Sequence, residues 1–222
     1  MTDIKTHLFF PVPVHIVNFG EDANAMNDEL CIDIMNEKEL TPTQTRSAIN
    51  GWQSNGLMEE KYSSFEELRY LIDQVFKNVL PKFGFANIDI DKEFVCKEFW
   101  ANVLDSAGAF HVPHIHGTGE TLFAGVYYPA NYPHGEEDGP DLRASSVPEP
   151  GDLVLFDPAS TDKRSVIPGN VDRYPYYGSE ICIRPRKGNL IIFPSYLSHM
   201  VAPLTRSGLT RMSISFSYMK RN

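Results

Sequence analysis

The spacing of apolar residues changes near residue 86, from a helical period to the pattern of short strands. Before this point, Met26, Leu30 and Ile34 follow one another at steps of four, which places them on one face of a helix. This stripe predicts a helix over residues 22–38, with its apolar side turned toward the rest of the protein.

A second helix is predicted further along the same N-terminal part. Ser64 followed by Glu67 matches a capping box, in which each side chain bonds the backbone N–H of the other residue at a helix start. The helix is expected to stop around Leu80–Pro81, with Gly84 beyond, because proline cannot continue a helix and glycine favours its final turn. Its apolar face consists of Leu68, Leu71, Ile72, Val75 and Val79.

After residue 90 the chain carries short runs rich in β-branched and aromatic residues, separated by turns with glycine and proline. Many short strands predict a mainly β fold, a sandwich or jelly roll, with the helices packed on one sheet. We expect a single domain over residues 1–222, with a helix-rich layer over 1–86 and a β core over 87–222. The expected strands are 94–103, 121–128, 153–156, 181–183, 190–193 and 211–218.

The last of these strands has two different faces. One face is large and apolar and is expected to pack on the helices, whereas the other carries small polar residues and one arginine. Small side chains leave room for a ligand, and a guanidinium can hold a carboxylate through two parallel hydrogen bonds. The apolar face is Met212, Ile214, Phe216 and Tyr218, and the polar face is Arg211, Ser213, Ser215 and Ser217.

Three histidines have the spacing of a metal site. Because side chains alternate along a strand, His114 and His116 are expected to project from one face and to bind one ion together. His199, from a distant strand, can complete a facial set and leave other coordination positions open for chemistry. His111, three residues before His114, can line the same opening.

The composition of the chain limits which binding partners and which cellular location we expect. The net charge of −9 and the lack of a basic stripe disfavour a nucleic acid or an anionic membrane surface as partner. The N-terminal residues do not match a signal peptide and no run reaches about 18 apolar residues, so we expect a cytoplasmic protein. Cys31, Cys96 and Cys182, far apart and without a CxxC motif, agree with buried free thiols. The helical layer can support a homodimer.

Several motifs together carry a family resemblance. They are His114–Ile115–His116 before Gly125–Val126–Tyr127–Tyr128, Pro185–Arg186–Lys187–Gly188 before Ile191–Ile192–Phe193–Pro194, His199–Met200–Val201–Ala202–Pro203, and Arg211–Met212–Ser213–Ile214–Ser215–Phe216. With these motifs, residues 100–218 resemble the 2-oxoglutarate- and Fe(II)-dependent dioxygenases, and within them a branch related to the prolyl hydroxylases. Gly51–Trp52–Gln53–Ser54 is similar to the same branch, so the resemblance spans most of the chain.

This resemblance implies a double-stranded β-helix with an iron centre, and Fe(II) and 2-oxoglutarate as cofactors. His114 and His199 match the two histidines of the family's iron site. Arg211, with Ser213, matches the element that holds the distal carboxylate of 2-oxoglutarate, and Tyr128 matches a position whose hydroxyl often helps. The implied reaction hydroxylates an unactivated C–H bond and decarboxylates 2-oxoglutarate to succinate. The similarity to prolyl hydroxylases favours a peptide or protein as the substrate, and a small molecule is the alternative.

The chain departs from the family pattern at one ligand position. The family carries His-x-Asp or His-x-Glu, whereas this chain has His116 where the carboxylate is expected. Three arrangements are open: His116 itself binds the ion, a carboxylate such as Asp157 comes from elsewhere, or water completes the sphere around His114 and His199. We favour His116, because the strand period places it beside His114. Asp157 also fits a turn residue before Pro158.

Two further interpretations compete with the dioxygenase. The same segments match a cupin, a metalloenzyme that does not use 2-oxoglutarate, whose site would be His114, His116, Glu120 and His199. That match fails at Tyr196, where the cupin motif carries glycine, and it leaves Arg211–Met212–Ser213 unexplained. The other interpretation is a non-catalytic jelly-roll module that binds a sugar or peptide. Bound metal would exclude the module, and dependence on 2-oxoglutarate would exclude the cupin.

Overall fold

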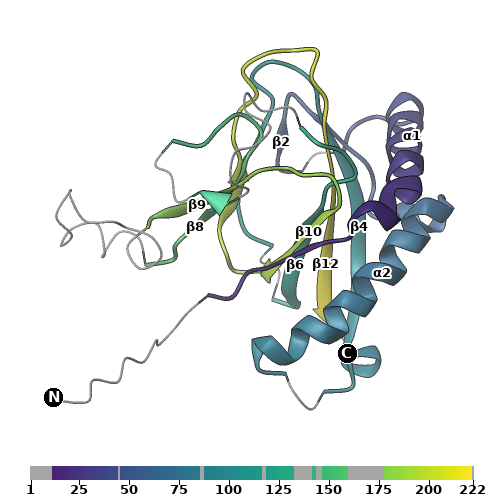
Figure 1. Ribbon diagram of the computed structural model, residues 1–222, viewed down its shortest axis with the longest axis vertical. Helices are drawn as coiled ribbons and strands as arrows, with labels where there is room; N and C mark the ends of the chain where they lie inside the picture. Colours follow the sequence, from purple (N-terminus) through teal and green to yellow (C-terminus); the bar gives the residue numbers. More distant parts are fainter. Residues whose placement is uncertain are drawn as a thin grey trace, which may run out of the picture.

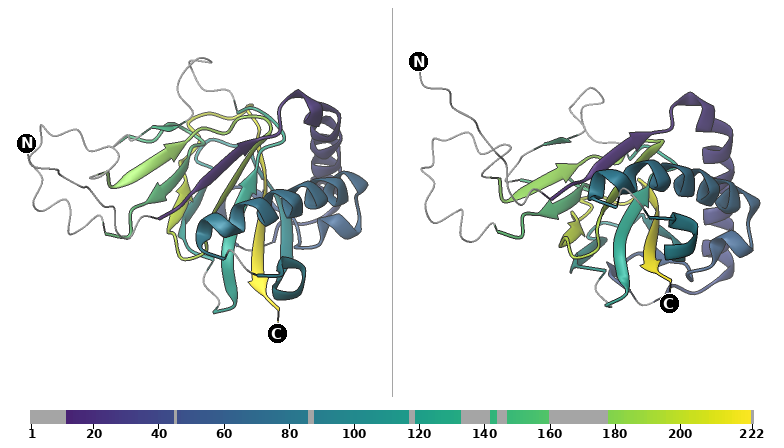
Figure 2. Two further views of the ribbon diagram at one scale, coloured as in Figure 1. Left: turned by 60° about the horizontal axis from the view of Figure 1, so that its bottom comes forward. Right: turned by 90° about the horizontal axis from the view of Figure 1, so that it is seen from below.

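The computed structural model describes residues 12–44, 46–85, 88–116, 119–132, 142–143, 147–159 and 178–221. Its strands form two six-stranded sheets, and two long helices lie along the outer side of one of them (Figure 1 and Figure 2). The mainly β jelly roll with helices packed on one sheet, predicted from the sequence, is therefore confirmed.

Both sheets are built from antiparallel pairs, in the orders β1-β10-β6-β12-β4-β3 and β2-β5-β11-β8-β9-β7. The first contains β1 His15–Asn18, β3 Trp52–Gln53, β4 Phe94–Leu104, β6 Thr121–Tyr127, β10 Asn189–Pro194 and β12 Arg211–Lys220. The second contains β2 Ala48–Ile49, β5 Phe110–His114, β7 Leu142–Arg143, β8 Leu153–Phe156, β9 Glu180–Ile183 and β11 His199–Val201. Every strand expected from the sequence is present. Residues before 86 also supply strands to both sheets, in addition to the two long helices.

The two long helices cover the first sheet. They are α1 Asn24–Leu40 and α2 Ser63–Val79, accompanied by the short α3 Ile90–Glu93 and by 3-10 turns at Glu21–Ala23, Met58–Glu60 and Leu80–Phe83. Met26, Leu30 and Ile34 of α1 are buried, as their helical stripe predicts. They belong to one apolar core that also contains the buried face of α2 and residues of β4, β6, β10 and β12.

The capping box predicted for α2 is wrong. The helix begins at Ser63, and no side chain caps its N-terminus. Ser64 is buried inside the first turn, where its hydroxyl donates a hydrogen bond to the carboxylate of Asp33 in α1 at 2.5 Å. Ser64 therefore joins the two helices, and this contact between distant segments takes the place of the local cap.

Strand β12 connects the helical side of the first sheet with the interior between the sheets. It pairs with β4 on one side and with β6 on the other. Phe216 and Tyr218 are buried under the helices, and the Tyr218 ring stacks on Phe76 of α2 with centroids 3.8 Å apart. Its opposite face lines a pocket with Arg211, Ser213 and Ser215. The division of faces predicted for this strand is confirmed.

The cysteines are free thiols, as expected. Cys96 and Cys182 are buried, and Cys31 is half-buried. Burial raises the pKa of the Cys96 thiol to about 12, which keeps it protonated and unreactive. Within the described residues, none of the helices combines the length and the apolar character that a membrane span needs.

Replacing Gly125 in β6 with alanine should strongly destabilise the fold. A Cβ at this position would lie 2.1 Å from Cζ of Phe216 and 2.6 Å from the backbone oxygen of Ile191, so both neighbouring strands would have to shift. We expect the free energy of unfolding, measured by urea denaturation, to fall by about 1–3 kcal/mol or more. Gly56→Ala is the control, because its Cβ would meet only the end of Arg46, at 3.4 Å. Equal losses in both variants would contradict this packing argument.

Candidate functional site

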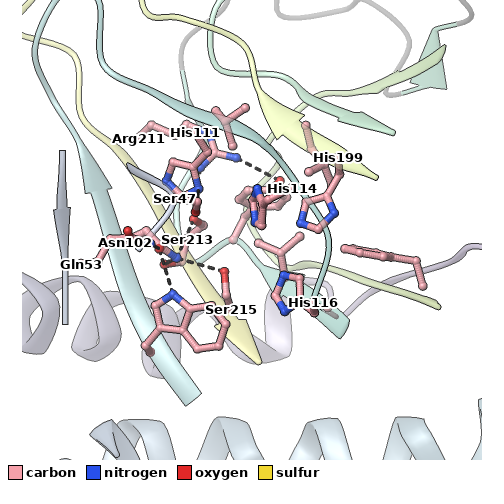
Figure 3. Close-up of a pocket in the computed structure, with 17 residues that line it drawn as sticks. Ser47, Gln53, Asn102, His111, His114, His116, His199, Arg211, Ser213 and Ser215 are labelled. Carbon is pink, nitrogen blue, oxygen red and sulfur yellow. Dashed lines mark hydrogen bonds between the residues drawn. The ribbon is translucent and has the colours of Figure 1, made fainter. Parts of the chain in front are cut away.

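A pocket lies between the two sheets, and polar side chains gather in it (Figure 3). Strands of both sheets line it, including β4, β6 and β12 of the first and β5, β8 and β11 of the second. The residues that the sequence analysis selected as metal or cofactor ligands meet here. They are Tyr128, His114, His116, His199, Arg211 and Ser213.

His114, His116 and His199 form a cluster that can hold a metal ion. One ligand atom from each residue lies within 4.8 Å of the other two. The ring centroids are 4.3 Å apart for His114 and His199, 5.1 Å for His116 and His199, and 5.5 Å for His114 and His116. Three imidazoles this close to one another suit a three-nitrogen metal site with further positions open.

An irregularity in β5 and the segment that follows it bring these histidines together. His114 lies opposite His199, but the next pair in the ladder involves His111, so β5 carries an extra residue relative to β11. This bulge lets both His111 and His114 line the pocket, although a regular strand would place residues three apart on opposite faces. His116 lies beyond the end of β5, and its backbone N–H donates to the carbonyl of Ser195 at 3.0 Å. It therefore reaches the cluster from the segment that follows β5 and not from the regular strand that the sequence predicted.

Hydrogen bonds at Nδ1 orient the three rings. In His114 and His199, Nδ1 donates to the backbone carbonyl two residues earlier, at 2.7 and 2.9 Å. A carbonyl oxygen can only accept, so Nδ1 carries the proton and Nε2 keeps its lone pair. Nδ1 of His116 lies 3.1 Å from the hydroxyl of Ser217. With Nδ1 engaged in each ring, Nε2 is the nitrogen available to a metal ion.

Burial keeps the three histidines neutral. It lowers the pKa of His116 to about 3 and the pKa of His199 to about 4, and the charge on neighbouring histidines acts in the same direction. Burial also lowers the pKa of His114. Neutral imidazole is the form that binds metal, so the cluster needs no deprotonation at neutral pH.

Arg211 is buried in the same pocket, with 1% of its surface exposed. Its Nε donates to the carbonyl of Gly151 at 2.8 Å, and its two terminal nitrogens donate to the hydroxyls of Ser213 and Tyr128, each at 3.1 Å. These bonds use three of the five guanidinium N–H groups and leave one on each terminal nitrogen. No carboxylate in the described part of the chain forms an ion pair with it. A buried cation with two such groups favours an anionic ligand.

Two other candidates from the sequence lie outside the pocket. Asp157 follows β8, and its carboxylate accepts a hydrogen bond from the backbone N–H of Ala159 at 3.0 Å, as a turn residue does. Glu120, the additional ligand of the cupin interpretation, is exposed just before β6. Among the described residues, the group able to hold a metal includes neither carboxylate.

The sequence analysis missed a polar cluster in the pocket, which is centred on Asn102 (Figure 3). The side-chain oxygen of Asn102 accepts hydrogen bonds from Gln53 at 2.7 Å and from the indole N–H of Trp100 at 3.1 Å. Its side-chain nitrogen donates to the hydroxyl of Ser215 at 3.0 Å. The Trp100 ring stacks against His116, with centroids 5.9 Å apart. The alternation of side chains along β4 could have predicted this cluster from the sequence, because it places Trp100 and Asn102 on the same face, the one turned away from the helices.

Solved structures with this fold include several enzymes. A prolyl hydroxylase from Trichoplax adhaerens, in complex with a hypoxia inducible factor peptide fragment, has 15% sequence identity and a TM-score of 0.60, over 93% of this chain and 83% of that one. A prolyl-4-hydroxylase from Pseudomonas putida has 15% identity and a TM-score of 0.58, over 95% and 94%. HygX from Streptomyces hygroscopicus, with nickel, 2-oxoglutarate and hygromycin B bound, has 11% identity and a TM-score of 0.55, over 94% and 83%. At these identities the likeness shows the fold.

Sequence comparison identifies the family. No curated protein matches the chain. The family described as "Putative 2OG-Fe(II) oxygenase" matches residues 98–217, which is 120 of the 222 residues. The matched segment contains every predicted metal and cofactor ligand in the pocket. The resemblance that the motifs indicated is confirmed, and the chain belongs to the 2-oxoglutarate- and Fe(II)-dependent oxygenases.

Proposed function

We propose that this protein is a hydroxylase in which His114, His116 and His199 hold Fe(II) and Arg211 anchors 2-oxoglutarate. One observation carries the proposal: a buried guanidinium with two free N–H groups shares a pocket with three neutral imidazoles. The chain thereby offers a nitrogen donor set for a metal ion and a cationic anchor for a dicarboxylate. A metal ion, Fe(II), and a dicarboxylate, 2-oxoglutarate, are the two cofactors named in the description of the family.

The histidine cluster fits a divalent metal ion. Each Nδ1 is engaged elsewhere, so three Nε2 lone pairs are available, and burial keeps them unprotonated. Three protein ligands leave other coordination positions open for cosubstrate and dioxygen. A histidine in place of the family's carboxylate makes the site one negative charge poorer, and this favours an anionic cosubstrate.

Arg211 fits the distal carboxylate of 2-oxoglutarate. Its two remaining N–H groups sit on different terminal nitrogens, which is what a bidentate contact with a carboxylate requires. Ser213 and Tyr128 hold the guanidinium through their hydroxyl oxygens, so each hydroxyl proton can be donated to the same carboxylate. The oxo acid can then extend from Arg211 toward the histidines in the same pocket.

The reaction that we propose balances without further reagents. A substrate C–H group, 2-oxoglutarate and dioxygen give the substrate alcohol, succinate and carbon dioxide, so one oxygen atom enters each of the first two products. Fe(II), when bound, supplies the oxygen chemistry that side chains lack. The chain's own part is to fix the metal with three imidazoles, to hold the far end of the oxo acid, and to orient both.

We further propose a peptide or protein substrate. Ile115 and Tyr196 are large apolar side chains with 51% and 58% of their surfaces exposed. Each adjoins a residue of the hydrogen bond between His116 and Ser195, so both stand next to the metal cluster. Exposed apolar groups beside a reactive site suit contact with a polypeptide, and the net charge of −9 disfavours a nucleic acid.

Anaerobic addition of Fe(II) and then 2-oxoglutarate should produce a weak visible metal-to-ligand charge-transfer band. Arg211→Ala should still bind iron, but its affinity for 2-oxoglutarate should fall by about a hundredfold or more, because a charge-assisted bidentate contact is lost. Arg211→Lys, which keeps the charge and is less disruptive in a buried site, should show an intermediate affinity. Iron binding without a band in the wild type would favour the cupin, and no metal binding would favour the ligand-binding module.

Metal titration can identify the third ligand. His116→Ala and His199→Ala should each abolish tight Fe(II) binding and turnover, because each removes one of three ligand nitrogens. Asp157→Asn is the matched control and should bind Fe(II) like the wild type, since this carboxylate stabilises a turn. Tight binding in His116→Ala together with its loss in Asp157→Asn would reverse the assignment.

Metal affinity should depend little on pH between 7.5 and 5.5. Protonation competes with the metal only below the pKa of each ligand. Burial lowers the pKa of all three histidines, to about 3 for His116 and about 4 for His199. Histidines that titrated near 6.5 would lose about tenfold in affinity each over this interval. Competition titrations with Mn(II) at both pH values measure the difference. A loss of affinity that follows titration near 6.5 would show that the cluster is solvated.

A further inference from the structure

His111 is a polar group in the pocket that the proposed function leaves unused. It belongs to β5, and only 6% of its surface is exposed. Its Nε2 atom is buried, and no hydrogen-bond partner for it occurs anywhere in the described segments. The ring lines the pocket beside Arg211, as Figure 3 shows. A buried polar atom without a partner, turned into a binding site, indicates a ligand that supplies the partner.

The contact at the other ring nitrogen indicates what Nε2 can do. Nδ1 lies 3.3 Å from the hydroxyl of Ser47. The Ser47 hydroxyl can donate to Nδ1 or accept from it, and it donates in the tautomer that carries the ring proton on Nε2. A neutral imidazole that accepts at Nδ1 carries its proton on Nε2. Burial and the charge of Arg211 hold the pKa of His111 well below its usual range, which keeps the ring neutral. In the tautomer whose Nδ1 accepts from Ser47, Nε2 is an N–H donor, and an anion held by Arg211 would favour this tautomer.

His111 lies near both the histidine cluster and Arg211. Its ring centroid lies 6.4 Å from that of His114. The ring also lies beside Arg211, and both side chains line the same pocket (Figure 3). The donor therefore stands close to the guanidinium, where an anion held by Arg211 would lie.

We propose that His111 is an additional cosubstrate-binding group, whose Nε2–H donates a hydrogen bond to the distal carboxylate of 2-oxoglutarate held by Arg211. The inference rests on the proposed function, because it takes 2-oxoglutarate as the anion in the pocket. A carboxylate has about four lone-pair sites, so it can accept from His111 and from both N–H groups of Arg211 together with one of the hydroxyls of Ser213 and Tyr128. His111 thereby helps the site to distinguish a dicarboxylic oxo acid from a monocarboxylic one.

Two amide variants test this role with matched chemistry. In His111→Gln the side-chain amide can reach the place of Nε2, whereas in His111→Asn it reaches only the place of Nδ1, next to Ser47. The probes are 2-oxoglutarate and 2-oxopentanoate, which has a methyl group in place of the distal carboxylate. Calorimetry on the anaerobic Fe(II)-loaded protein gives the dissociation constants, and thermal melts show whether each variant is folded.

His111→Asn should bind 2-oxoglutarate about ten- to a hundredfold more weakly than the wild type, as expected for a lost hydrogen bond to a charged group. Its affinity for 2-oxopentanoate should stay within about twofold of the wild type, because no distal carboxylate is present to lose a contact. His111→Gln should recover most of the affinity for 2-oxoglutarate. This selective effect would not arise if His111 only filled space.

Three results would overturn the inference about His111. They are an unchanged affinity of His111→Asn for 2-oxoglutarate, an equal loss for both acids, and failure of a folded His111→Gln to recover affinity. Failure of the proposed function looks different, because a wild type that binds both acids equally would show that Arg211 anchors no distal carboxylate. The preference of the wild type for 2-oxoglutarate over 2-oxopentanoate is therefore measured before any variant. Its absence would contradict the proposed function, whereas its presence leaves the variants to test His111 alone.

Discussion

A buried arginine without a carboxylate partner in the described part of the chain constrains the whole pocket. Removing a guanidinium from water is costly unless its N–H groups find acceptors. Arg211 stands in the first sheet and donates to the carbonyl of Gly151, which precedes β8 of the second sheet, so one hydrogen bond connects the two sheets. Gly151 has a φ of 82°, a conformation that favours glycine, and its carbonyl is presented from that turn. The two remaining N–H groups are left for an acceptor in the pocket.

The contacts around His114, His116 and His199 hold their three rings in fixed orientations. Backbone carbonyls fix the tautomers of His114 and His199, and a hydroxyl of β12 contacts His116. Phe193 packs edge-on against His199, with ring centroids 4.9 Å apart, and Trp100 stacks on His116. Aromatic packing, together with hydrogen bonds that leave only Nε2 available, fixes the three imidazoles in the orientation that a metal ion would need.

The helices matter to the site because they fix the sheet that carries it. Phe76 of α2 contacts Phe94, Phe123 and Tyr218, which come from three adjacent strands of the first sheet. This aromatic core lies on the opposite face of β12 from Arg211, so packing against α2 determines the position of the strand that presents the arginine. A binding group on a packed strand is placed more accurately than one on a loop.

The sequence alone determined the features that depend on local periodicity. Alternation along residues 211–218 separated the core face from the pocket face, and a step of four located α1. Short apolar runs located six of the described strands, β4, β6, β8, β9, β10 and β12, to within a residue or two. The motif around His114 and His199 indicated the metal site. Tertiary structure decided the rest. The bulge that turns His111 inward depends on the pairing with β11, the place of His116 depends on a bond to Ser195, and Ser64 bonds α1 instead of capping α2. The physical reason is the same in each case: periodicity encodes which face a residue takes within its own element, whereas strand register and hydrogen bonds between distant segments exist only after those segments pack together.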